Sequence, residues 1–293
     1  MDKKLILLTN DDGILAPGLT AMHHALARLG EVYVVAPATE QSGVSQSVTF
    51  RTPLVIKDVL LQGERWGWAV EGSPADCVKV GVCVLCPRKP DVVVSGINWG
   101  QNAGINILYS GTVGAAMDGA IVGIPSFALS IQDAAVPPFE RAAAAAADII
   151  EQILQKIEER PEAELDYCGN LVPDLYNINF SAGSLESDSP EIVVTPMDTT
   201  PYANALEERI DTFHRKYYWL TPNPRSRIPE RTTDMNELKR GKIIVTPLLL
   251  DRTNHALCKT MQDWDLSTTV DVSASDATST YVQIKTARGE IGR

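Results

Sequence analysis

The chain has little positive charge. Of its 293 residues, 26 are lysine or arginine and 37 are aspartate or glutamate, so the formal net charge is −11. Nucleic-acid polymers and anionic membrane surfaces both favour positively charged partners. The charge balance therefore argues against either as the main partner. A small anionic ligand would need a local positive group, such as a metal ion.

The sequence also lacks a long apolar run. No stretch approaches the roughly 18 uninterrupted apolar residues that a membrane-spanning helix needs. Near the N-terminus, the apolar segment of MDKKLILLTNDDG gives way to Asn10 and Asp11 almost at once, without the cleavage site of a signal peptide. We therefore expect a cytoplasmic protein that has no membrane partner.

Cysteine and histidine patterns typical of disulfide or zinc sites are missing. The five cysteines are scattered and lie mostly in apolar surroundings, which is typical of reduced, buried thiols. Cys83 and Cys86 form a C-x-x-C, but no second Cys or His pair lies nearby, so we expect core packing there. The four histidines show no H-E-x-x-H or similar ligand spacing.

The first half of the chain alternates strand-like and helix-like segments with short links. Strands are predicted over 4–9, 31–37, 91–96 and 124–131, hairpin strands over 54–59 and 66–72, and helices over 17–30 and 139–160. Ser73 is predicted to cap a helix that begins at Pro74, with Asp76 closing a capping box. This alternation is typical of an α/β fold, a mostly parallel sheet covered by helices.

Beyond residue 170 the pattern changes. Strands are predicted over 175–180 and 191–196, and the aromatic and basic segment 209–224 suggests an extended hairpin. A short helix and a returning strand are expected within 232–248. We expect one domain over residues 1–265, with the hairpin arm at roughly 200–250, and a C-terminal tail over 266–293 for which the sequence predicts no structure.

Two adjacent aspartates, Asp11 and Asp12, end the first predicted strand in the sequence NDDG. Neighbouring side chains of a strand point to opposite faces, so both carboxylates can serve one site only if the chain turns there. Gly13 permits that turn. Alternatively, one aspartate caps the helix that begins near Pro17 or forms an Asx-turn.

Four polar stretches follow predicted strands: NDDG, EQSGVS, SGINWGQNAG and YSGTVG. In open α/β sheets, ligands bind beyond the carboxyl ends of the strands, so these stretches should meet at one rim of the sheet. Asp11 and Asp12 offer carboxylate oxygens, Ser42 a hydroxyl and Asn98 an amide oxygen. This all-oxygen set suits Mg²⁺ or Mn²⁺ better than zinc.

The stretch YSGTVGAA places Ser110, Gly111 and Thr112 at the start of a predicted helix. Unpaired N–H groups and the positive end of the helix dipole make such a start an anion site, for which phosphate is the natural ligand. Asn102 can donate its amide to the same phosphate. The alternative is a serine cap followed by small residues that allow close helix–sheet packing.

In order and spacing, NDDGILAPGL, ATEQSGVSQSVT, EGSPADCV, SGINWGQNAG and YSGTVGAA closely resemble the survival protein SurE family, and the resemblance extends from residue 4 to about 253. It implies a metal-dependent phosphatase that hydrolyses nucleoside 5′- and 3′-monophosphates, with short polyphosphate as a substrate of some members. It also implies a Rossmann-like three-layer α/β core, and C-terminal arms whose exchange builds a homodimer or homotetramer.

The resemblance also assigns the site residues. The implied ligands of one divalent ion (Mg²⁺, Mn²⁺ or Co²⁺) are Asp11, Asp12, Ser42 and Asn98. The implied phosphate contacts are Asn102, Ser110, Gly111 and Thr112. The catalytic groups would be Asp11 and Asp12, either of which could act as base or nucleophile.

The sequence departs from the family pattern at three positions. Ser181 stands where a proline usually follows an Asn-x-Asn, Pro196 stands where an arginine is common, and His214 replaces the glycine of a tight turn. These positions lie on the arm and substrate side. They leave the nucleotide preference and the geometry of the arm open.

Two other functions are compatible with parts of the sequence. A strand followed by a glycine-containing loop and a helix also describes the site of a dinucleotide-dependent oxidoreductase. However, neither NDDGILAPG nor GINWGQNAG contains G-x-G-x-x-G directly before a helix. A non-enzymatic partner-binding protein is suggested by the aromatic residues of YYWL, although these are also suited to the interface of a homo-oligomer.

Overall fold

The computed structural model describes residues 3–132, 134–161, 165, 169, 171–200, 204–222 and 231–267. The chain divides into two compact units, Met1–Leu250 and Asp251–Arg293. The second unit contains one described helix, α6 (His255–Met261), which is capped by the side chain of Asn254. The single domain expected over 1–265 stays a prediction, and the tail expected from residue 266 lies outside the described residues from 268 onward.

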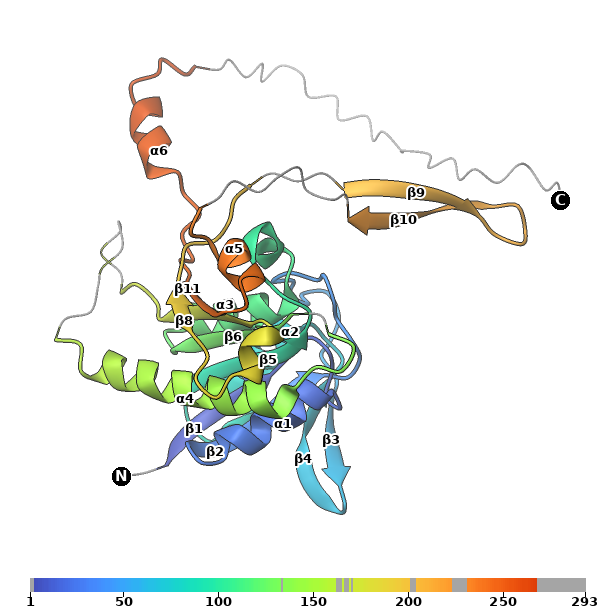
Figure 1. Ribbon diagram of the computed structural model, residues 1–293, viewed down its shortest axis with the longest axis vertical. Coiled ribbons are helices and arrows are strands. Elements are labelled where there is room, and N and C mark those ends of the chain that lie inside the picture. Colours follow the sequence, from blue (N-terminus) through green and yellow to red (C-terminus); the bar gives the residue numbers. More distant parts are fainter. Residues whose placement is uncertain are drawn as a thin grey trace, which may run out of the picture. The chain divides into compact units, whose positions relative to one another are not determined.

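A nine-stranded sheet forms the centre of the first unit (Figure 1). Its strands, in spatial order, are β3 (Ile56–Leu61), β4 (Glu64–Val70), β2 (Gly30–Pro37), β1 (Lys4–Thr9), β5 (Val92–Trp99), β6 (Ser126–Ile131), β7 (Leu175–Phe180), β11 (Ile243–Pro247) and β8 (Ile192–Val194). Neighbours from β4 to β7 are parallel, whereas β3 pairs with β4, and β11 with β7, in antiparallel fashion. The predicted α/β fold class is confirmed.

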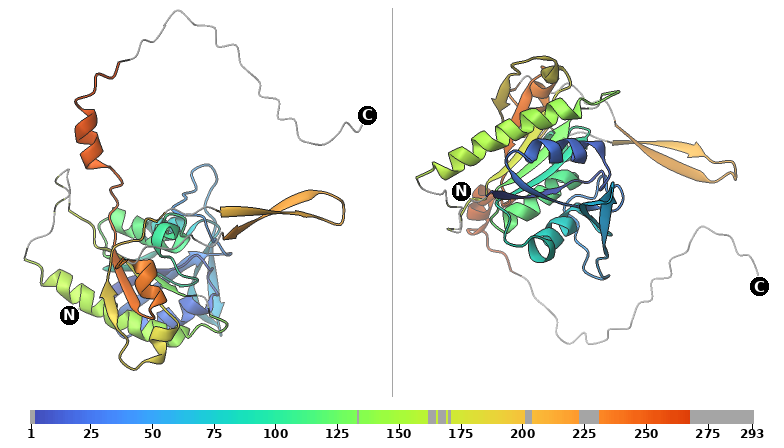
Figure 2. Two further views of the ribbon diagram at one scale, coloured as in Figure 1. Left: turned by 45° about the horizontal axis from the view of Figure 1, so that its top comes forward. Right: turned by 90° about the horizontal axis from the view of Figure 1, so that it is seen from below.

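Helices cover both faces of the sheet. On one face α1 (Pro17–Leu26) packs beside α4 (Phe139–Glu158), and on the other α2 (Pro74–Val80) packs beside α3 (Gly111–Ile121), as Figure 2 shows. Residues 5–8 of strand β1 are all apolar because alternate residues enter the two layers: Ile6 belongs to the core under α1 and α4, and Leu7 to the core under α2. Of the helices in the described part of the chain, none is both long and apolar enough to span a bilayer.

Two predictions made from local sequence have different outcomes. The capping box is confirmed, because Ser73 Oγ accepts from Asp76 N at 3.1 Å and Ser73 N donates to Asp76 Oδ2 at 2.9 Å. The predicted helix over 17–30 is too long. Helix α1 ends at Leu26, because the chain must turn so that Gly30 can pair with Lys4 at the start of β2.

The expectation that the cysteines are buried thiols is only partly right. Cys77 is buried, but Cys83 and Cys258 are exposed, and Cys86 is intermediate. Cys83 lies in η1 (Gly81–Leu85), a short π-helix after α2 in which only Gly81 is buried. A fifth cysteine, Cys168, lies outside the described residues.

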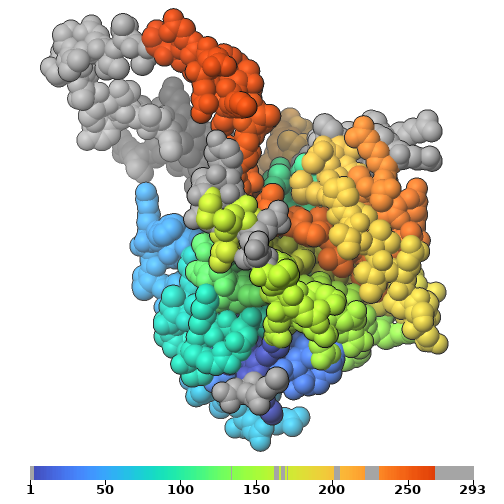
Figure 3. All heavy atoms as spheres, turned by 90° about the vertical axis from the view of Figure 1, so that its left-hand side faces the viewer, coloured from blue at the N-terminus to red at the C-terminus, as the bar shows by residue number. Residues whose placement is uncertain are grey.

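The second half of the first unit completes the sheet and adds a separate hairpin. The hairpin consists of β9 (Asn204–Ile210) and β10 (Lys216–Pro222), which pair with each other and with no other strand of the described residues. Its turn holds His214 at a φ of 59°, the left-handed conformation that explains why glycine suits this position. Helix α5 (Asp234–Lys239) precedes β11, which pairs with β8, and Figure 3 shows yellow and orange residues of this part of the chain side by side.

Candidate functional site

The two aspartates lie in a tight turn that begins where β1 ends at Thr9. Asn10 closes this turn with its side chain: Nδ2 donates to the carbonyl of Gly13 at 2.9 Å, and Gly13 N donates to Oδ1 at 3.2 Å. Gly13 has a φ of +100°, which a side chain would strain. The turn expected at Gly13 is therefore present, and it brings both aspartates to the carboxyl edge of the sheet.

Asp11 faces the first turn of α3. The hydroxyl of Thr112 donates to Asp11 Oδ1 at 2.5 Å, and Asp11 is only 3% exposed. A Cβ on Gly111 would lie 2.9 Å from Asp11 Cβ, so only glycine allows this approach. Burial raises the pKa of the Asp11 carboxyl, and the hydrogen bonds from Thr112 oppose that rise.

Asp12 lies beside the end of β5. Its Oδ2 accepts a hydrogen bond from the main-chain N of Trp99 at 3.1 Å. Burial, and then the charges of Asp11 and Glu40, raise the pKa of Asp12 to about 6. The charged groups that shift the pKa values of Asp11 and Asp12 are all carboxylates, so a bound cation would relieve repulsion at this position.

The loop after β2 reaches the same turn through a main-chain contact. Gln41 N donates to the carbonyl of Asp11 at 2.7 Å, which brings the next residue, Ser42, toward the aspartates. The hydroxyl of Ser42 is exposed and donates to Glu40 at 2.7 Å. Asn98, near the end of β5, donates its amide nitrogen to Gly100 O at 2.6 Å, and its amide oxygen takes no part in that bond.

Asn102 is held on three sides. Its main-chain N donates to Asn179 Oδ1 at 2.9 Å, and its carbonyl accepts from Asn177 Nδ2 at 2.7 Å and Asn179 Nδ2 at 3.1 Å. Its own amide nitrogen donates to Ser130 Oγ at 2.8 Å. Strands β6 and β7 therefore fix the loop that follows Asn98.

Ser110 caps α3, as the sequence predicted. Its hydroxyl oxygen accepts from Val113 N at 3.1 Å, and Gly111 is the first residue of the helix. The Thr112 hydroxyl does not face open solvent, because Thr112 is fully buried and bound to Asp11. The start of α3 thus joins the aspartate turn, and the predicted metal and phosphate residues belong to adjoining segments.

Comparison with known proteins identifies the family. The family model described as Survival protein SurE matches residues 6–204. A 5′-nucleotidase SurE of Rhodopirellula baltica is 45% identical over 262 residues, which are 89% of this chain and 98% of that protein. The chain belongs to the SurE family.

Other members of the SurE family agree with this assignment. The 5′-nucleotidase SurE 1 of Thermus thermophilus is 40% identical over 260 residues, 87% of this chain and 96% of that protein. The crystal structure of the SurE protein from Aquifex aeolicus superimposes with a TM-score of 0.72 at 36% identity, covering 88% of this chain and 98% of that one. The fold is accordingly the Rossmann-like α/β fold expected from the resemblance.

The residues of this SurE chain can be compared with the needs of a divalent metal ion. Within the described residues, His, Cys, Asp and Glu side chains form no group of three or more that could hold a metal. Asp11 and Asp12 are a pair of carboxylates, so a metal here would also depend on Ser42 and Asn98. Carboxylate, hydroxyl and amide oxygens are hard ligands, and the raised pKa values of the two aspartates mark a site that favours added positive charge. The residues therefore suit such an ion.

Several residues of the candidate site were missed by reasoning from sequence. The charge of Glu40 raises the pKa values of both aspartates. The sequence sign of its role was its place in the same loop as Ser42. Asn177 and Asn179 hold Asn102, and their signal was two polar residues at alternate positions of the otherwise apolar strand β7. Ser130 offered no comparable signal.

One of the departures from the SurE pattern has a local structural role. Ser181, which follows the strand containing Asn179, accepts a hydrogen bond from Ser184 N at 2.9 Å. The hydroxyl of Ser184 donates to the carbonyl of Ser181 at 2.7 Å. Ser181 therefore stabilises the start of η3 (Gly183–Glu186).

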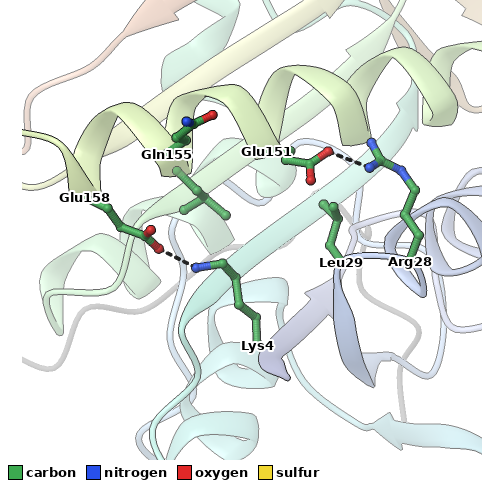
Figure 4. Close-up of a pocket in the computed structure, with 7 residues that line it drawn as sticks. Lys4, Arg28, Leu29, Glu151, Gln155 and Glu158 are labelled. Atoms are coloured by element: carbon green, nitrogen blue, oxygen red, sulfur yellow. Dashed lines mark hydrogen bonds and ion pairs between the residues drawn. The ribbon is translucent and has the colours of Figure 1, made fainter. Parts of the chain in front are cut away.

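A separate cavity of about 290 Å³ lies at the amino end of β1 (Figure 4). Its two basic residues are already paired: Lys4 with Glu158 at 2.6 Å, and Arg28 with Glu151 at 2.5 Å. Parallel strands place ligand sites at their carboxyl ends, and this cavity lies at the opposite edge from Asp11 and Asp12. These ion pairs join β1, and the turn that follows α1, to α4.

Proposed function

We propose that this protein is a divalent-metal-dependent phosphatase that hydrolyses nucleoside 5′- and 3′-monophosphates to nucleoside and phosphate. Short-chain polyphosphate is a further proposed substrate. The observation that carries the proposal is the pair of adjacent carboxylates, Asp11 and Asp12, joined to the start of α3 by Thr112. The relatives named 5′-nucleotidase SurE support the 5′-nucleotidase part of this proposal.

In this proposal Asp11, Asp12, Ser42 and Asn98 would hold Mg²⁺, Mn²⁺ or Co²⁺. When bound, such an ion neutralises phosphate charge and lowers the pKa of a bound water. Asp11 is almost fully buried and its Oδ1 is occupied by Thr112, so we assign it to holding the ion. Asp12 is more accessible and its Oδ2 accepts from Trp99 N, so we assign proton transfer from the attacking water to Asp12 Oδ1.

The phosphate would lie against the start of α3. Gly111 contributes a main-chain N–H at the first helical position, where the helix dipole favours an anion. Ser110, Asn102 and the main chain of Thr112, whose hydroxyl is bound to Asp11, complete the proposed phosphate contacts. Because this wall is held in place by hydrogen bonds to Asp11, Ser130 and Asn179, it needs little rearrangement when charge develops on the phosphate.

The proposal is tested by phosphate release from nucleoside monophosphates in the presence of Mg²⁺, Mn²⁺ or Co²⁺. We expect Asp12→Asn and Asn98→Ala to abolish release while the melting temperature shows an intact fold. Asp188→Asn is the control, because Asp188 is a fully exposed carboxylate on another part of the surface. Full activity in either site variant would contradict the proposal.

We also propose that the hairpin builds a homodimer or homotetramer by exchange between copies. Leu206 and Leu220 are register partners in the hairpin, and they are 66% and 64% exposed in the single chain. Tyr218 and Trp219 are also more than half exposed. Burial of these side chains by a second copy would remove apolar surface from water.

The two alternative functions have less support. A dinucleotide-dependent oxidoreductase would place pyrophosphate beside Asp11, Asp12 and Glu40, whose charges would repel it, and membership of the SurE family favours a phosphatase. Binding of a nicotinamide cofactor, followed by absorbance, tests this alternative. A purely partner-binding role does not explain the aspartate pair.

A further inference from the structure

Two residues with exposed aromatic side chains, Trp99 and Tyr109, are next to proposed site residues in the sequence. Trp99 is 50% exposed and comes immediately after Asn98, and its main-chain N donates to Asp12 Oδ2 at 3.1 Å. Tyr109 is 57% exposed and comes immediately before Ser110, the N-cap of α3. The two segments that donate hydrogen bonds to the aspartate carboxylates therefore each carry one exposed aromatic ring.

The main chain of both residues is fixed although their rings are exposed. Trp99 pairs with Ile131 at the end of β5, and the next residue, Gly100, donates to Ile131 O at 2.9 Å. The carbonyl of Tyr109 accepts from Ser45 N at 3.0 Å. With the main chain already fixed, only side-chain freedom remains to be lost when a ligand covers these rings.

We propose that Trp99, together with Tyr109, binds the nucleobase of the substrate by stacking. This inference rests on the proposed function, because ribose carries the base away from the phosphate and so places it beside the phosphate site rather than within it. Trp99 and Tyr109 each adjoin a proposed site residue, Asn98 or Ser110, along the chain. Because neighbouring strand side chains point to opposite faces, the Trp99 ring would meet the base at the border of the phosphate site and not beside the Asn98 amide.

Stacking determines which substrates are preferred. Every base presents an aromatic face, so a stacking surface accepts all of them and does not read their hydrogen-bonding edges. The larger purine rings cover more of the indole than pyrimidines do. The preferred class is therefore purine nucleoside monophosphates, followed by pyrimidine nucleotides, with sugar phosphates that lack a base as the poorest substrates.

The test compares kcat/KM for adenosine 5′-monophosphate with kcat/KM for ribose 5-phosphate, in the full-length chain with Mn²⁺. In Trp99→Ala we expect the ratio of these two values to fall about 5- to 150-fold, as loss of one stacked base implies. The ratio for adenosine over cytidine monophosphate should also fall. Trp99→Phe should retain most of the wild-type preference because it keeps an aromatic face.

Leu60→Ala is the matched control, since Leu60 is also an exposed apolar residue (60%) but lies on β3. It should leave the ratio unchanged. If Trp99→Ala lowers kcat/KM for both substrates equally, or lowers neither, the stacking role is overturned while the phosphatase proposal stands. If the wild-type protein releases phosphate from neither substrate, the proposed function itself has failed.

Discussion

The hydroxyl of Thr112 donates to Asp11 Oδ1 at 2.5 Å, across 101 positions of the sequence. One residue follows the first strand of the sheet, and the other lies in the first turn of α3. The bond joins the proposed metal-binding turn to the proposed phosphate-binding helix. Changes at Thr112 should therefore affect both stability and activity.

Thr112→Val removes this donor with almost no change of shape. The buried Asp11 carboxylate then lacks one partner, so we expect the free energy of unfolding to fall by about 1–3 kcal/mol. The lost bond stabilises the ionised carboxylate, so the loss should be larger at pH 8 than at pH 4. Urea denaturation of the metal-free protein measures it. Thr112→Ser keeps a hydroxyl, so its free energy of unfolding should fall less. Equal stability of Thr112→Val and wild type at pH 8 would show that the hydrogen bond does not stabilise the fold.

Gly111→Ala should displace Asp11. The added Cβ would lie 2.9 Å from Asp11 Cβ and 3.2 Å from the carbonyl of Gln41, so the aspartate turn must move. Such overpacking typically costs about 1–3 kcal/mol of stability, and we expect phosphate release to fall at least tenfold. Gly183→Ala is the matched control, because a Cβ there has no neighbour within 4 Å. Similar activity in the two variants would contradict the close approach at Gly111.

The pH dependence of stability in chelator should report on Asp12. Its pKa is raised from 3.8 to about 6 in the folded protein, so the folded state holds this proton more tightly than the unfolded state. The resulting stability is present below pH 4 and is lost as pH rises through 6. Asp12→Asn removes this loss, so without metal it should melt at a higher temperature than wild type at pH 8.

Added Mn²⁺ should reverse the order of the two melting temperatures, so that wild type melts above Asp12→Asn. The reason is that only the wild-type carboxylate is stabilised by the cation. The comparison is made between the two proteins because other carboxylates, such as Asp91 beside Arg88, have lowered pKa values and act in the opposite direction. An Asp12→Asn variant that melts below wild type at pH 8 in chelator would mean that Asp12 is not under charge repulsion.

Leu220→Asp should weaken assembly of the protein. Leu220 and its register partner Leu206 are exposed, and a charge placed between them makes burial by another copy costly. Sedimentation velocity should show a shift toward monomer, with the melting temperature of the core unchanged. Thr212→Asp adds the same charge at the exposed turn of the hairpin and should not change the sedimentation. A Leu220→Asp protein that sediments like wild type would contradict assembly through this hairpin.

Sequence patterns predicted the features that short segments determine. The apolar run of β1, the capping box of Ser73 and Asp76, and the Ser110 cap depend on residues within a few positions of one another, and all are present. The end of α1 was predicted too late because it depends on the pairing of Lys4 with Gly30, which is a tertiary contact. The α/β order of elements was therefore predictable, and one helix boundary was not.

The candidate site was predictable to a smaller extent. The four polar stretches could be placed at one rim because parallel strands present their carboxyl ends together. Which side chains bond across the rim could not be deduced: Asn179 holds Asn102 across 77 positions, and Thr112 turns its hydroxyl to Asp11. Such pairings are set by how the strands and α3 pack, which no local pattern encodes.

The central claim, that the Asp11–Asp12 turn holds a divalent ion needed for phosphate release, is tested most directly by one titration. The initial rate of phosphate release from adenosine 5′-monophosphate is measured for the full-length protein in excess chelator, and again as free Mn²⁺ is restored. We predict a rate near zero in chelator and a saturable recovery with Mn²⁺. A full rate that persists in excess chelator would contradict the claim.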